Sequence, residues 1–156
     1  MRALISIVIS LALLSGIGCR PRPTCIPLNT PGTGPNPQIV SGVKFTVHQY
    51  GGAVPPNSVI KTQNSPAGAQ TGLDAGFSLD IGLSVLARKI SATLVQYARP
   101  ATMEAFDSAG ASVGKVTMTA GNGVPEVLTL GGQWIQKVVI TSPSDEVLLL
   151  RFCYAP

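Results

Sequence analysis

Between residues 90 and 154 the sequence is a succession of short segments in which apolar and polar residues tend to alternate. Six such segments occur: ISATLVQY (90–97), ATMEAF (101–106), ASVGKVTMTA (111–120), VLTL (127–130), WIQKVVITS (134–142) and EVLLLRFCY (146–154). Turn-forming residues separate them, as in the stretch DSAG at 107–110. A period of two places alternate side chains on one face of an extended chain, so each segment predicts a short β-strand.

The same pattern extends towards the N-terminus. In GVKFTVHQY (42–50) every second residue is apolar, and GFSLDIGL (76–83) repeats this pattern. SVIKT (58–62) predicts a further short strand, and LSVLARK (83–89) fits either the end of a strand or a helical turn. Residues 63–74 have no periodicity and predict a long loop.

These segments predict eight or nine strands at intervals of about 8–12 residues, a spacing typical of a β-sandwich or barrel. The composition agrees, because 17 Gly and 13 Pro with only 12% charged residues suit an all-β domain better than a helical one. We therefore expect an all-β, antiparallel β-sandwich over residues 38–156. The unbroken apolar run at 147–150 predicts either a central strand that is covered on both faces or a strand that bridges two sheets.

The N-terminus has the pattern of an export signal. Arg2 precedes an apolar stretch at 3–14, and Gly16 and Gly18 are small residues before a cysteine. We expect residues 1–18 to be a signal peptide, too short for a membrane span, and the protein to be exported, either secreted or held at the cell envelope. Residues 19–37 contain six prolines and predict an extended Pro-rich tether.

The three cysteines allow one disulfide. Cys19 resembles the lipid-acceptor cysteine of bacterial lipoproteins, although Gly16 stands where that family usually has Leu. Lipidation and plain cleavage at the Gly18–Cys19 bond both fit the pattern, and a lipid there would be the expected membrane attachment. If Cys19 is lipidated, Cys25 and Cys153 remain as a pair that can be oxidised outside the cytoplasm. Three free thiols, or a Cys19–Cys25 bond with Cys153 alone, are the alternatives.

Two stretches, VQYARPATMEAFDSAGASVGKV (95–116) and WIQKVVITSPSDEVLLLRFCY (134–154), resemble galactose-binding-domain-like jelly rolls. They share a strand, a Pro-containing turn, a strand ending in an aromatic residue and Asp, a Gly turn, and later the spacing I-x-x-V-x-I. The resemblance covers about residues 73–154 and implies a jelly roll in a small exported bacterial protein. It also implies glycan binding through loops at one end and, in some members, a structural calcium, for which Asp74 is the candidate ligand.

Residues for catalysis are sparse. His48 is the only histidine and lies on the polar side of a predicted strand, without a Ser or Cys nucleophile beside it in a triad pattern. The adjacent acids Asp145 and Glu146 fall in a turn, where solvated side chains are the simpler interpretation. No Gly-rich phosphate loop, Cys/His zinc spacing or basic stripe for nucleic acid is present. We therefore expect no enzyme activity, no nucleic-acid partner and no cofactor other than the calcium.

Sugars are commonly bound by exposed aromatic rings beside polar groups, because one face of a sugar ring is apolar C–H. Tyr50, Tyr97 with its neighbour Arg99, and Trp134 are the candidates. Trp134 also fits a core position, because it shares strand parity with Val138. The expected function is an exported, non-catalytic module that binds a glycan at the cell envelope. The alternative is a structural or protein-interaction subunit of the envelope with no small ligand.

Overall fold

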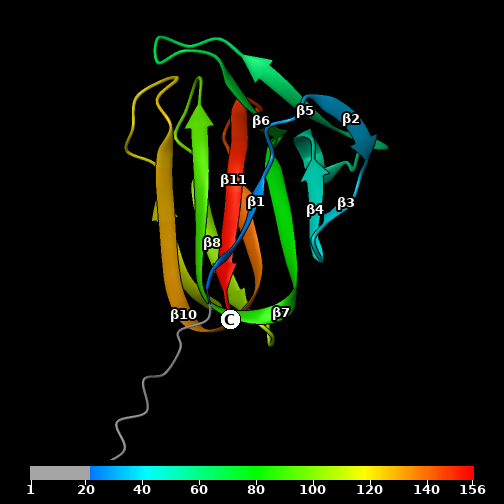
Figure 1. Ribbon diagram of the computed structural model, residues 1–156, viewed down its shortest axis with the longest axis vertical. Helices are drawn as coiled ribbons and strands as arrows, with labels where there is room; N and C mark the ends of the chain where they lie inside the picture. Colours follow the sequence, from blue (N-terminus) through cyan, green and yellow to red (C-terminus); the bar gives the residue numbers. More distant parts are fainter. Residues whose placement is uncertain (1–21) are drawn as a thin grey trace, which may run out of the picture.

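The computed structural model describes residues 22–156, and this part of the chain is almost entirely β-structure, as predicted (Figure 1). It contains one short 3₁₀ helix, η1 (Tyr50–Gly52), and eleven strands. The strands are β1 (Thr24–Pro27), β2 (Gly32–Pro35), β3 (Gln38–Val40), β4 (Val43–His48), β5 (Asn57–Gln63), β6 (Gln70–Asp74), β7 (Ser78–Gln96), β8 (Thr102–Asp107), β9 (Ser112–Thr117), β10 (Glu126–Thr141) and β11 (Val147–Ala155). Among these described residues, no helix has the length and apolarity to cross a membrane.

Two long strands, β7 and β10, organise the fold. They pair antiparallel from Glu126 beside Leu94 to Thr141 beside Ser78. In Figure 1 both strands turn at the lower end of the view, close to the C-terminus, so that each of them rises on two sides of the domain. Because the two halves of each strand have different neighbours, a single continuous sheet folds over into two packed layers.

The first layer consists of β9, β8, the second half of β10, the first half of β7, β4 and β3, in that order. The second layer consists of the first half of β10, the second half of β7, β11, β6, β5 and β2, with β1 also paired to β11. These strand pairings are antiparallel, so the predicted antiparallel sandwich is confirmed. The apolar run in β11 is also central, and Val147, Leu148 and Leu149 are buried.

The core lies between the layers and is built from the alternating apolar side chains of both. In β4, Val43, Phe45 and Val47 are buried while the residues between them are not. Phe45 of the first layer meets Phe152 of the second edge-to-face, with ring centroids 6.2 Å apart. Such a pair contributes about 0.5–1.5 kcal/mol beyond the burial of its area. The apolar residues that recur at every second position in the sequence thus form the inner face of each layer.

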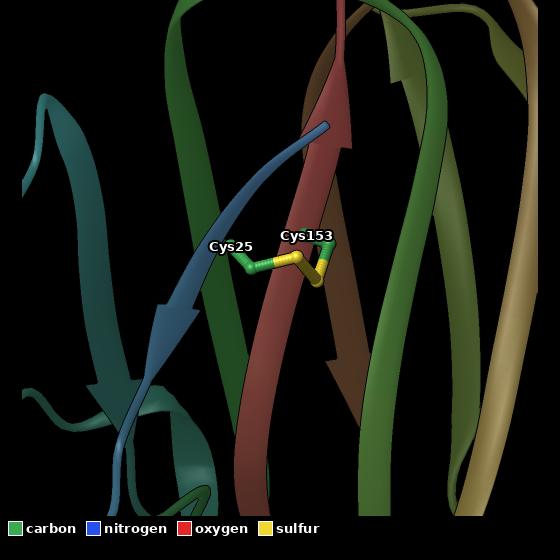
Figure 2. Close-up of a disulfide and its surroundings, with 2 residues drawn as sticks. All are labelled: Cys25 and Cys153. Atoms are coloured by element: carbon green, nitrogen blue, oxygen red, sulfur yellow. A yellow bond between two sulfur atoms is a disulfide. The ribbon is translucent and has the colours of Figure 1, made fainter. Parts of the chain in front are cut away.

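The predicted disulfide between Cys25 and Cys153 is present. It joins β1 to β11 at a position where the two cysteines are register partners, with Cα atoms 4.1 Å apart (Figure 2). The bond links two strands that are separated by 128 residues in the sequence. Neither alternative, free Cys25 and Cys153 thiols or a Cys19–Cys25 bond, occurs in this structure.

The domain begins earlier than the expected boundary at residue 38. Residues 24–27 and 32–35 of the expected tether form β1 and β2, which pair with β11 and β5. Proline is tolerated here because Pro27 and Pro35 are the last residues of their strands and β2 is at the edge of its layer. Residues 24–27 and 32–35 therefore belong to the folded domain and not to a tether. The expected signal peptide at 1–18 lies outside the described residues.

Two further differences concern the strands, of which the described residues contain eleven rather than the expected eight or nine. The loop predicted at 63–74 contains β6, where Gly72 packs against β11: a Cβ on Gly72 would lie 2.8 Å from the carbonyl oxygen of Leu149. β6 can pack this closely because Gly72 has no side chain. A glycine adds no apolar residue to an alternating pattern, so the sequence pattern does not predict this strand. Conversely, two predicted segments merge into one bent strand, β7 (Ser78–Gln96), because the LSVLARK stretch continues it around the turn.

Candidate functional site

The outer face of the first layer carries side chains in rows that cross four strands. In one row Lys44 of β4, Gly82 of β7, Lys137 of β10 and Phe106 of β8 are register partners. These positions alternate with buried residues of the same strands, so the side chains point away from the core. The row therefore places one lysine on each side of a glycine and an aromatic ring beyond the second lysine.

A groove of about 650 Å³ lies on this face, and we call it the sheet groove. Gly82 leaves room within it, because a Cβ there would meet only the Cβ of Lys44, at 3.9 Å. The lining residues come from four strands and the β8–β9 turn: Lys44, Thr46, Asp80, Gly82, Leu83, Phe106, Asp107, Ser108, Gly110, Gln136, Lys137 and Val139.

Asp80 is the electrostatic centre of the sheet groove. Its Oδ2 forms an ion pair with Nζ of Lys137 at 2.7 Å, and Nε2 of His48 lies 3.7 Å from the same oxygen. His48 is held from its other side by the carbonyl oxygen of Gly52, 3.5 Å from Nδ1. Within the described residues Lys44 has no carboxylate partner. Its ammonium group is therefore the cation of the groove that remains for a ligand.

The β8–β9 turn forms one wall of the sheet groove and is fixed by Asp107. The Oδ1 of Asp107 accepts hydrogen bonds from the N–H groups of Ala109 and Ala111, both at 2.9 Å. Gly110 takes the positive φ of 81° that closes the turn. Asp107 is thus engaged by its own backbone, and Phe106 directly before it supplies the apolar surface of this wall.

Tyr50 and Tyr97, predicted from the sequence, lie outside the sheet groove and at opposite ends of β7. Tyr50 is 82% exposed in η1 and packs edge-to-face on Phe77, just before the strand begins. Tyr97 follows the last residue of the strand, and its hydroxyl donates to the carbonyl of Gln63 at 3.3 Å. Burial raises the pKa of the Tyr97 phenol. Arg99 is exposed in the next turn.

Trp134 lies in β10, beside the turn of β7. It is 49% exposed, and the guanidinium carbon of Arg88 lies 5.4 Å from its ring centroid. Its backbone has a φ of 66°, at a place where the register with β7 shifts between Gly131 and Ile135. The irregularity breaks the parity with Val138. Trp134 therefore does not take the core position that the sequence pattern allowed.

Asp74, the expected calcium ligand, forms an ion pair with Nζ of Lys61 at 2.7 Å and accepts a hydrogen bond from the N–H of Gly76 at 3.4 Å. In residues 22–156, no three or more His, Cys, Asp or Glu side chains are grouped to hold a metal ion. Calcium binding stays a prediction. Cys19, the expected lipid acceptor, lies outside the described residues.

Sequence reasoning did not single out the main groove residues Lys44, Asp80, Phe106 and Lys137. Their outward parity is visible in the sequence, since each follows or precedes a buried apolar residue. Their meeting depends on the register between strands that are far apart in the chain, and residues of the same parity could pair in several registers.

Comparisons with known proteins add one partial likeness. No protein-family model and no curated protein matches the sequence. Among solved structures, the chain is similar to part of an isomalto-dextranase from Arthrobacter globiformis T6 in complex with panose, at 14% identity and a TM-score of 0.38. The alignment covers 85% of this chain and 23% of that one, so this chain spans less than a quarter of that protein's length.

Proposed function

We propose that the protein is an exported, non-catalytic module that binds a glycan in the sheet groove. The observation that carries this proposal is the row Lys44, Gly82, Lys137 and Phe106 across an open sheet face, in which the two lysines flank Gly82 and Phe106 lies on the far side of Lys137. A sugar ring has hydroxyl groups around its edge and apolar C–H groups on one face. The ring of Phe106 suits the C–H face, and Asp80 with the two lysines suits the hydroxyl groups.

The resemblance to galactose-binding-domain-like jelly rolls favours the same class of ligand but places it on end loops. Here the face of the first layer offers more, because charged side chains and an aromatic ring converge on one hollow. By contrast, the hydroxyl of Tyr97 is already engaged with Gln63, and Tyr50 packs against Phe77. We therefore assign the glycan to the sheet groove rather than to the residues expected from the sequence.

A binding role suits the two groove carboxylates better than a catalytic one. Glycoside hydrolysis needs one carboxyl that donates a proton and another that acts as base or nucleophile. Asp80 is paired with Lys137, and Asp107 accepts two backbone hydrogen bonds in its own turn. Each carboxylate is thus already engaged by donors of the protein itself, which favours a role in positioning over one in proton transfer.

Export follows from the expected signal peptide and is supported by the Cys25–Cys153 disulfide, since such bonds persist mainly in oxidising compartments. The module would then meet its glycan outside the cytoplasm, either as a secreted protein or held at the cell envelope by a lipid on Cys19.

Filling the groove provides the sharpest test. Gly82→Val should fold normally, because the position has room for a Cβ and a β-branched residue suits a strand. It should lower affinity for envelope polysaccharides by more than about tenfold, because the new side chain occupies the space of the sugar ring. Phe106→Ala should weaken binding by a similar factor through loss of the stacking surface. Glycan arrays, followed by titration calorimetry on the best ligand, measure both effects.

Two control variants separate the groove from other surfaces. Gly32→Val places the same side chain on β2, where nothing lies within 4 Å of the new Cβ. Tyr50→Ala removes the most exposed aromatic ring outside the groove. Both should bind as the parent does. Loss of binding in Tyr50→Ala with full binding in Gly82→Val would move the site to the loops. Absence of glycan binding, together with a stoichiometric crosslinked envelope protein, would favour the protein-interaction function instead.

A further inference from the structure

The end of the domain at which β7 and β10 turn has a protruding tip. From Ile135 to Lys137, β10 advances two residues while its partners on β7, Ala87 and Gly82, are five residues apart. Three residues of β7 are therefore in excess at this point, and Ser84, Val85 and Leu86 all stand exposed.

This tip carries large apolar side chains in the open. Val85 is 44% exposed, Leu86 is 37% exposed and Trp134 is 49% exposed. The neighbouring Ala87 is fully buried and fixes the tip to the core. Trp134 lies close to Val85 and Leu86, because the next residue, Ile135, is the register partner of Ala87.

A basic rim surrounds the apolar residues. Arg88 lies over the ring of Trp134, and Lys89 is next to it in β7. Arg22 and Lys89 line the same hollow of about 430 Å³, beside the disulfide. We call Arg22, Val85, Leu86, Arg88, Lys89 and Trp134 the tip patch. The acid on the neighbouring strand is Asp107, the register partner of Ile135, and it is occupied by two backbone N–H groups.

We propose that the tip patch is a membrane-docking surface that seats on a bilayer containing anionic lipids. Tryptophan with a few aliphatic side chains and a rim of Arg and Lys is the combination that partitions into the headgroup region. The apolar residues enter the boundary of the acyl chains, and the three cations face lipid phosphates. Each cation near such a surface strengthens binding about fivefold. Among residues 22–156 none of the three cations has a carboxylate partner, and the core of a protein interface is usually depleted of charged residues, so anionic lipid is the better match.

The direction of the chain fits this orientation. β1 starts at the end of the domain that carries the turns of β7 and β10, so the described part of the chain begins beside the tip patch (Figure 1). The sheet groove lies on the outer face of the first layer, so docking through the tip keeps that face open to ligand. The docking surface does not depend on the proposed glycan function, and it acts with or without a lipid on Cys19.

Trp134 is the only tryptophan, so its fluorescence reports on the tip in the full chain, whatever the N-terminal residues bind. We expect its emission to shift to shorter wavelength and to be quenched by brominated acyl chains in vesicles of phosphatidylcholine with phosphatidylglycerol. High salt and vesicles of phosphatidylcholine alone should weaken both signals. The double variant Arg88→Gln/Lys89→Gln should lower the partition coefficient for anionic vesicles roughly twentyfold. The double variant Val85→Ser/Leu86→Ser should insert less deeply, so brominated acyl chains should quench Trp134 less.

Matched controls remove the same groups elsewhere. Arg99→Gln/Lys115→Gln deletes two exposed cations outside the tip, and Val54→Ser/Val124→Ser deletes two exposed aliphatic side chains. Both should leave Trp134 quenching unchanged. Unshifted and unquenched Trp134 in anionic vesicles would overturn the proposal. It would equally be overturned by equal losses in tip and control variants, or by an emission shift that needs an envelope protein rather than lipid.

Discussion

The disulfide between Cys25 and Cys153 should carry a large share of the stability of this domain. It closes a loop with a sequence separation of 128 residues. In the chain-entropy model a closure of this length lowers the entropy of the unfolded chain by about 17 cal/mol/K, or about 5 kcal/mol at 25 °C. That figure is an upper value, because disulfides often stabilise less than the entropy model predicts. It is still large beside a total stability of about 5–15 kcal/mol for such a domain.

Part of this effect should appear as local opening of β1. The strand has four residues and pairs only with β11, and its buried side chain is Ile26, followed by Leu28. Ordering four residues costs roughly 4–8 kcal/mol of backbone entropy, and burying two aliphatic side chains returns about 3–6 kcal/mol. These terms nearly balance. Without the disulfide, β1 should therefore detach in a fraction of native molecules, which reduces the net loss of global stability to about 3–5 kcal/mol.

Thermal unfolding measures the global part. For a domain of this size the unfolding entropy is roughly 0.28 kcal/mol/K, so the midpoint should fall by about 10–18 °C. The parent with reductant and the Cys25→Ser/Cys153→Ser variant should give the same midpoint. Amide exchange measures the local part: the N–H of Leu28, which donates to the carbonyl of Leu150 at 2.9 Å, should lose protection first. A midpoint within about 3 °C of the oxidised protein would refute the reasoning, as would unchanged protection of Leu28.

Two smaller predictions address backbone contacts. Gly76→Ala should destabilise the fold by about 2–4 kcal/mol, because Gly76 has a φ of 59° and a Cβ would lie 2.6 Å from the carbonyl oxygen of His48; Gly110→Ala, with positive φ but open space, should cost only about 1 kcal/mol in the same urea titration. Hydrogen bonds from the N–H of Ala120, and then from Thr119, lower the pKa of Glu126 against the opposing effect of burial. Its contribution is present above the unfolded pKa and is lost as pH falls through the lowered one, so Glu126→Gln should cost about 1 kcal/mol at neutral pH, discounted for exposure, and nothing at pH 2. A difference that persists at pH 2 would contradict this origin.

Alternation every second residue was sufficient to predict where apolar side chains become buried. Phe45, Leu79 and Leu94 occupy the core as their parity indicates. The pattern failed where a strand is stabilised by something other than one buried face. β6 depends on the close approach of Gly72 to β11, and β1 depends on a covalent bond to Cys153.

The candidate site was harder to predict than the fold, because its parts are combined by register. Lys137 and Phe106 are both outward-facing in their own strands, but only the pairing of β8 with β10 makes them neighbours. The aromatic residues that the sequence made conspicuous, such as Tyr50 and Tyr97, end strands and lie in connections. A search for aromatic residues therefore selected positions in the connections between strands. The groove is instead formed by lysine, aspartate, glycine and phenylalanine residues that are aligned across four strands.

The bends in β7 and β10 connect the groove to the tip. Between Gly131 and Ile135, β10 advances four residues while β7 advances two, from Lys89 to Ala87, so the extra residues lie on β10. In the next step, to Gly82, the extra residues lie on β7. Extra residues on alternate strands increase the local twist and let one sheet turn into two layers. The same excess pushes Val85 and Leu86 out of the ladder and ends the regular pairing beside Gln136, which lines the groove. Two successive register shifts in the longest strand pair thus account for the turn of the sheet into two layers, for the exposed tip and for the end of the groove beside it.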